Sequence, residues 1–91
     1  MAPDELRLTS AREELEAAAE TADDDVREDV EETAAAFAEL VDDGRTPDHA
    51  LMDEHLNALR QAEERAEGET EDRIGQALSH AESYREELPQ S

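Results

Sequence analysis

The amino-acid sequence predicts an all-α protein, folded as a small antiparallel up-down-up-down four-helix bundle. Apolar residues recur at spacings of three and four in four successive segments, which is the period of a helix with one buried face. Two of the breaks between segments contain Gly44 and Gly68, and a third lies among consecutive aspartates. The segments are similar in length and their connections are short, which favours antiparallel neighbours. Nothing in the sequence alternates with the period of a strand.

The first helix is expected over about residues 4–22. Its apolar stripe is dominated by alanine, so this helix should approach its neighbour closely. The stripe consists of Leu8, Ala11, Leu15, Ala18, Ala19 and Ala22.

The second helix is expected over about residues 24–43, and its start is the least certain boundary. Asp23 is suited to an N-cap, and Asp24 and Asp25 are favourable in a first turn. The turn holds neither Gly nor Pro, so the alternative is one helix over residues 4–43, about 60 Å long. Matching segment lengths favour the break. The second stripe consists of Val26, Val30, Thr33, Phe37, Leu40 and Val41.

The third helix is expected over about residues 47–67. Gly44 suits a left-handed position after the second helix, Thr46 an N-cap, and Pro47 the first helical position. The third stripe consists of Met52, His55, Leu56, Leu59, Ala62 and Ala66.

The fourth helix is expected over about residues 71–88. Gly68 should end the third helix, Thr70 or Glu69 should begin the fourth, and Pro89 should stop it. The fourth stripe consists of Ile74, Ala77, Leu78, Ala81, Tyr84, Arg85 and Leu88.

The predicted core is thin for a chain of 91 residues. Domains of this size typically have only ~3–5 kcal/mol of stability from one core. We therefore expect folding to depend on high salt, and dimerisation would bury further surface. The large core members are expected to be Leu8, Leu15, Val26, Val30, Phe37, Leu40, Val41, Leu51, Met52, Leu56, Leu59, Ile74, Leu78, Tyr84 and Leu88.

The charge balance is strongly acidic: 28 Asp and Glu face 8 Arg and no Lys, for a net charge of -20. Disorder, a functional acidic surface and adaptation to high salt would each produce such a charge. The regular apolar stripes argue against disorder. Replacing Lys by Arg, Asp and Glu keeps the surface hydrated, and at 1 M salt a Debye length of about 3 Å screens the repulsion. Salt adaptation is therefore favoured.

The acidic surface gives no sign of a nucleic-acid partner. The arginines are scattered and outnumbered, and the acids surround every helix instead of following one face as a nucleic-acid mimic would require. No apolar run approaches the roughly 20 residues of a membrane span. The acidic start of the chain lacks the pattern of a secretion signal, so a cytoplasmic protein is expected.

The sequence contains no catalytic or cofactor-binding constellation. There is no Cys, no Gly-rich phosphate loop, and no Ser or Thr placed beside an oriented base. Ser79 and His80 are adjacent, but neighbours one position apart do not face each other on a helix. A protein without enzymatic activity or cofactor is expected.

Weak candidates for a metal site are His49, Asp53 and His55 on the third helix. A carboxylate-bridged di-iron bundle would need Glu-x-x-His motifs, and none is present. One His with one or two carboxylates is a poor transition-metal site. The competing interpretation places His55 in the core as a hydrogen-bonded histidine and gives His49 a local role in the first turn.

Arg85 is the one charged residue beside an apolar stripe. It could extend past the core edge, reach an acid on the neighbouring helix, or contact a protein partner.

The segment from Asp43 to Leu59 carries a distinctive pattern: Gly44, then Pro47-Asp48-His49, Leu51, His55 and Asn57-Ala58-Leu59. With Tyr84-Arg85-Glu86, it resembles a family of short helical proteins of halophilic archaea that is classed as a domain of unknown function. The resemblance implies a cytoplasmic protein of a haloarchaeon and brings no activity or catalytic residue. The chain departs from the family at the first turn, where a glycine is expected. The motif either fixes the central turn or forms a small polar site from His49, His55 and Asn57.

Two functions therefore compete. The leading hypothesis is a non-enzymatic, halophile-adapted helical module for protein interaction or self-association, as a homodimer or with a protein partner. The alternative is a metal- or small-ligand-binding bundle centred on His49, Asp53 and His55.

Overall fold

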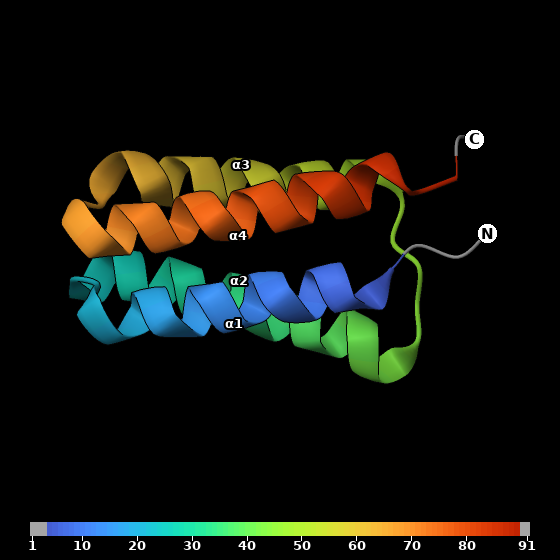
Figure 1. The fold of residues 1–91 in the computed structure, drawn as a ribbon, viewed down its shortest axis with the longest axis horizontal. Coiled ribbons are helices and arrows are strands. Elements are labelled where there is room, and N and C mark those ends of the chain that lie inside the picture. The colour runs from blue at the N-terminus through green and yellow to red at the C-terminus, as the bar shows by residue number, and fades with distance from the viewer. Residues whose placement is uncertain (1–3, 90–91) are drawn as a thin grey trace.

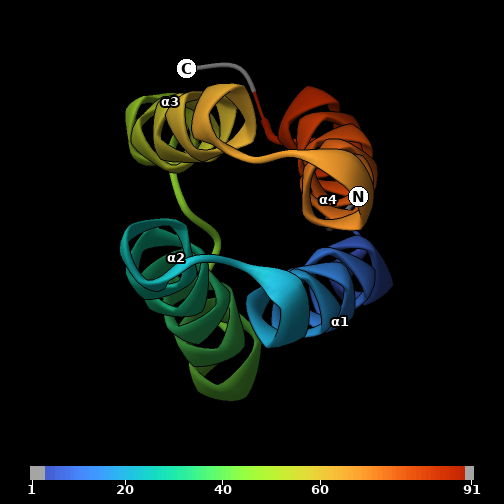
Figure 2. The same cartoon turned by 90° about the vertical axis from the view of Figure 1, so that its left-hand side faces the viewer.

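The computed structural model describes residues 4–89, and these form a four-helix bundle. Helices α1 (Glu5–Thr21), α2 (Asp24–Asp43), α3 (His49–Arg65) and α4 (Gly68–Glu86) follow one another in chain order, and the described residues contain no strand. Each helix runs antiparallel to the next (Figure 1), and in the end view the four helices occupy the corners of a square (Figure 2). The predicted fold class is confirmed, and α1 and α2 are separate helices.

The core is formed mainly by the predicted stripes, but Val41, which was expected in it, is only partly buried at its edge. Phe37 and Tyr84 are its largest fully buried side chains, and α1 packs most extensively, against both α4 and α2. The alanines of α1 allow this close packing, as expected. Leu51 was predicted in the core but is only half-buried, because Met52 takes the inward position and Leu51 lies beside the α2–α3 connection.

The α2–α3 connection begins as predicted and ends differently. Gly44 adopts a left-handed conformation at φ +64°, and its N–H donates to the Val41 carbonyl at 3.2 Å. Thr46 was expected to cap α3, but Asp48 does so: its carboxylate accepts from the Leu51 N–H at 2.8 Å. The stronger Asp cap places the helix start at His49, two residues later than expected.

Helix α4 starts earlier than predicted, at Gly68, which adopts φ +60°. Thr70 is not a cap. It is buried, and its hydroxyl lies 2.6 Å from the Thr21 hydroxyl at the end of α1. This contact between helices replaces the local capping role that the sequence suggested. Helix α4 ends at Glu86, and Leu88 beyond it still packs in the core.

The α1–α2 turn is closed by an arginine. Ala22 and Asp23 are extended, and Asp23 occupies the N-cap position of α2 as predicted, although its side chain makes no capping hydrogen bond. Instead Arg27 of α2 donates through Nε to the Ala19 carbonyl at 3.0 Å and through Nη2 to the Ala22 carbonyl at 2.8 Å. A guanidinium can thus satisfy helix-end carbonyls where no glycine is present.

Candidate functional site

Asp53 faces α4 and forms a two-pronged ion pair with Arg85. Arg85 Nε lies 2.6 Å from Oδ1 and Nη2 lies 3.3 Å from Oδ2. The hydrogen bonds from Arg85 lower the pKa of the Asp53 carboxyl. Arg85 thus reaches an acid on the neighbouring helix, one of the roles considered from sequence, and its guanidinium is already engaged within the chain.

His55 lies on the other side of α3 and faces α2. Its ring meets Phe37 edge-on, with centroids 5.6 Å apart and an interplanar angle of 86°. Burial lowers the pKa of His55. Asp29 and Glu32 of α2 line the same small cavity of about 260 Å³. His55 therefore packs at the α2–α3 seam, away from Asp53.

The remaining polar candidates do not join His55. Nε2 of His49 is buried and has no hydrogen-bond partner among the described residues. Asn57 is exposed, and its side-chain oxygen accepts only a long bond of 3.4 Å from Arg60. Across residues 4–89, no three or more His, Asp or Glu side chains are grouped so that they could hold a metal ion.

Arginines join the helices at every seam of the bundle. Six of the eight arginines contact a carboxylate or a carbonyl group that belongs to another helix or to the residue just after that helix. Each exposed pair contributes little alone, but together they place a positive charge between acidic helices. Besides Arg27 at the α1–α2 turn, the pairs are Arg7–Glu87 and Arg73–Glu14 for α1 and α4, Arg60–Glu82 and Arg85–Asp53 for α3 and α4, and Arg65 with Asp25 and Asp29 for α2 and α3.

Arg12 and Arg45 differ from the other arginines. Arg45 Nε lies 3.7 Å from Oδ2 of Asp43, the last residue of α2, and Arg12 Nη1 lies 3.8 Å from Oε2 of Glu16 on the same helix. Neither arginine joins two helices within residues 4–89. Arg12 lines a groove between α1 and α2, whereas Arg45 lines a separate cavity of about 360 Å³ at the α2–α3 connection.

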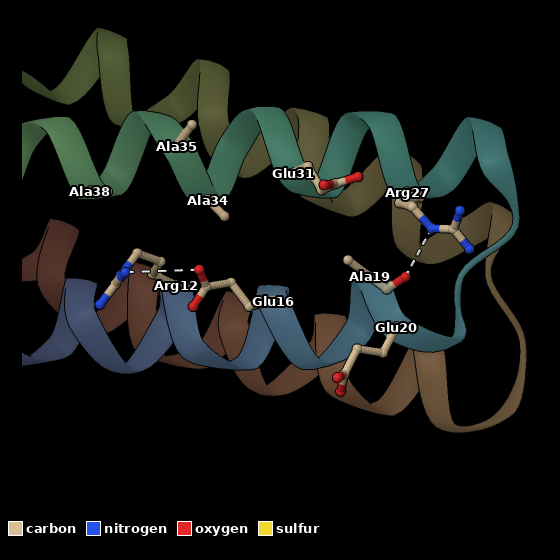
Figure 3. A pocket seen from close by; sticks show the side chains of 9 residues that line it. All are labelled: Arg12, Glu16, Ala19, Glu20, Arg27, Glu31, Ala34, Ala35 and Ala38. Atoms are coloured by element: carbon tan, nitrogen blue, oxygen red, sulfur yellow. Dashed lines mark hydrogen bonds and ion pairs between the residues drawn. The ribbon is translucent and has the colours of Figure 1, made fainter.

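This groove runs between the outer faces of α1 and α2 and has a volume of about 440 Å³ (Figure 3). Its surface is mostly apolar and is formed by four alanines, while five charged residues border it. Arg12 and Arg27 lie toward its two ends, as Figure 3 shows. We call it the α1–α2 groove; it is lined by Arg12, Glu16, Ala19, Glu20, Arg27, Glu31, Ala34, Ala35 and Ala38.

The groove was not identified from the sequence. A signal was present: Ala35 and Ala38 lie off the predicted stripe of α2, where a strongly acidic chain would otherwise place charge. Ala35 is exposed and Ala38 half-buried. Small apolar residues on an outward face are consistent with a contact surface.

No helix of the described residues is long and apolar enough to cross a membrane. No curated protein and no solved structure matches the chain. A family of unknown function, DUF7553, matches residues 2–87, which is nearly the whole sequence. The chain therefore belongs to the DUF7553 family, so its predicted membership of a family of unknown function is confirmed.

Proposed function

We propose that this protein is a non-enzymatic helical module that acts through protein contacts or self-association, and that the α1–α2 groove is its contact surface. The observation that carries the proposal is the groove itself. It combines an alanine floor with a charged border on an otherwise acidic surface. Interfaces typically combine an apolar centre with a polar rim, and the groove has this arrangement.

The proposal includes adaptation to a salt-rich cytoplasm. The chain carries a net charge of -20 without a single Lys, and its arginines are used to join acidic helices. Helices this acidic repel one another in dilute solution, and salt screens that repulsion. A salt-dependent fold with a local alanine surface fits a contact module better than a catalyst, since the sequence has no nucleophile paired with a base.

Site-specific photo-crosslinking tests the proposed surface. A photoreactive residue at Ala35 lies in the groove, and one at Ala50, an exposed alanine on α3, serves as the matched control. In cells of the source organism, we expect one defined adduct from position 35, identified by mass, and none from position 50. The adduct should disappear when Ala38→Trp fills the groove. Equal adducts at both positions, or none at position 35, would refute the proposal.

A further inference from the structure

We infer that the occupant of the α1–α2 groove is a second copy of this chain, bound so that the two α1 helices cross antiparallel about Glu16. In this arrangement Arg12 lies beside Glu20 of the partner subunit, and the reverse pair forms by symmetry. The inference rests on the proposed function of the groove and specifies its partner.

The spacing of charges on α1 supports this arrangement. Arg12, Glu16 and Glu20 follow one another at four-residue intervals and all line the groove. At 1.5 Å per residue, positions 12 and 20 are about 12 Å apart, with position 16 midway. A two-fold axis at Glu16 therefore places Arg12 of each copy opposite Glu20 of the partner subunit, as the symmetry of an isologous interface requires.

The ion pairs of the isolated chain leave these two residues available. Within the described residues, Arg12 forms only the 3.8 Å contact with Glu16 and no hydrogen bond. Glu20 is exposed and takes part in no ion pair within residues 4–89. The other interhelical seams contain Arg–acid pairs, so the α1 face carries complementary charges without partners on another helix.

The shape of the bundle permits such a contact. Ala19 of α1 and Ala34, Ala35 and Ala38 of α2 leave room for close approach of a second helix pair (Figure 3). The bundle measures 37 × 21 × 16 Å between Cα atoms, and its α1–α2 face spans the first and last of these dimensions. A contact that uses most of this face lies toward the lower end of the ~800 Å² that each partner contributes to a standard interface.

The symmetry places two Glu16 carboxylates near each other at the axis. Like charges at this point oppose association, and salt screens them together with the general repulsion between acidic subunits. We therefore expect the dimer to tighten as salt rises, and Glu16→Gln to strengthen it further.

Sedimentation of the full chain in molar KCl tests the inference, with circular dichroism confirming that each variant is folded. The wild type should dimerise; Arg12→Glu and Glu20→Arg should each weaken the dimer on the order of tenfold or more, and the double variant should regain it. Arg45→Glu is the matched control, because Arg45, like Arg12, has a single long contact with a residue close in sequence but lies outside the groove. It should leave the dimer unchanged.

Two results would overturn the inference: a wild-type monomer in molar KCl, or a double variant as weak as the single ones. A monomer that still gives a specific adduct with a different protein from position 35 would refute the second copy and support the groove as a contact surface. No specific adduct of any kind from position 35 would refute both proposals.

Discussion

Arg27 Nη2 lies 2.8 Å from the carbonyl oxygen of Ala22 across the α1–α2 turn. Ala22 is extended, so its carbonyl lies outside the hydrogen-bonding pattern of α1. At many helix ends a left-handed glycine satisfies a carbonyl of the last turn through its own N–H. Here a side chain from the next helix does so, and the second bond of the same guanidinium satisfies Ala19.

Removing this side chain should destabilise the bundle. Arg27→Ala should lower the free energy of unfolding by about 2 kcal/mol, because hydrogen bonds from a charged donor contribute about 1.5–3 kcal/mol. This corresponds to a fall in Tm of roughly 10 °C for a domain of this size. Arg27→Lys should recover only part of the loss, since one ammonium cannot match the forked geometry. Thermal unfolding in molar KCl gives the values.

Arg45→Ala is the control for this experiment. Arg45 is exposed and forms only a 3.7 Å contact with Asp43, so its replacement should change stability by less than about 0.5 kcal/mol. Equal losses for the two variants would show that Arg27 does not close the turn.

A second prediction concerns the hydroxyl pair between α1 and α4. Thr70 is buried, and the Thr21 hydroxyl lies 2.6 Å from its own. Thr21→Ala should cost about 1–2 kcal/mol, because it leaves a buried hydroxyl without a partner. Adding Thr70→Val should restore part of that loss. Chemical denaturation of the two single variants and the double variant measures the coupling, and strictly additive losses would contradict the pairing.

The sequence was sufficient to predict the four helices, because a stripe of period 3.6 depends on local residues alone. It did not reveal the role of Arg27, since a side chain that caps a helix eight residues away depends on the angle of the turn. The starts of α3 and α4 were misplaced because several residues compete as caps: Asp48 prevailed over Thr46, and Thr70 was taken up by a contact between helices.

The candidate metal ligands also show what local spacing can and cannot predict. His49 and Asp53 are four positions apart and share one side of α3, whereas Asp53 and His55 are two apart and at 100° per residue point in nearly opposite directions. Periodicity alone therefore separates the proposed ligands. The alanines outside the stripe of α2 are a periodic signal of a contact surface, but the shape of the α1–α2 groove could not be predicted from periodicity, because it depends on how two helices are inclined to each other.

A third prediction follows from the seam between α2 and α3. Burial lowers the folded-state pKa of His55 below its ordinary value of 6.5, so the unfolded chain binds the proton more readily. The stability that His55 contributes is therefore present above pH 6.5 and is lost as the pH falls through the folded-state pKa. Between about pH 7.5 and pH 5.5, wild type should lose more stability than His55→Gln.

Wild type and His55→Gln carry the same carboxylates, so the difference between their stabilities at each pH is due to the His55 imidazole. Tm measured across this range in molar KCl provides the comparison. Parallel curves for wild type and His55→Gln would mean that burial does not shift this histidine.

A fourth prediction concerns metal ions. His55 faces α2, and Asp53 is held by Arg85 on the opposite side of α3, so the proposed ligands cannot meet without breaking that pair. Calorimetry with zinc in molar KCl should give only heats of dilution, for wild type and for His49→Ala alike. A saturable heat in the wild type that His49→Ala removes would establish a metal site instead.

We propose that the charge of -20 serves hydration in high salt, and that the arginines hold the acidic helices together only when the repulsion between them is screened. Circular dichroism during a titration from molar KCl to dilute buffer at neutral pH tests it most directly. We predict a cooperative loss of helix as the Debye length grows from about 3 Å to tens of ångströms. Full helix content in dilute buffer would contradict the claim.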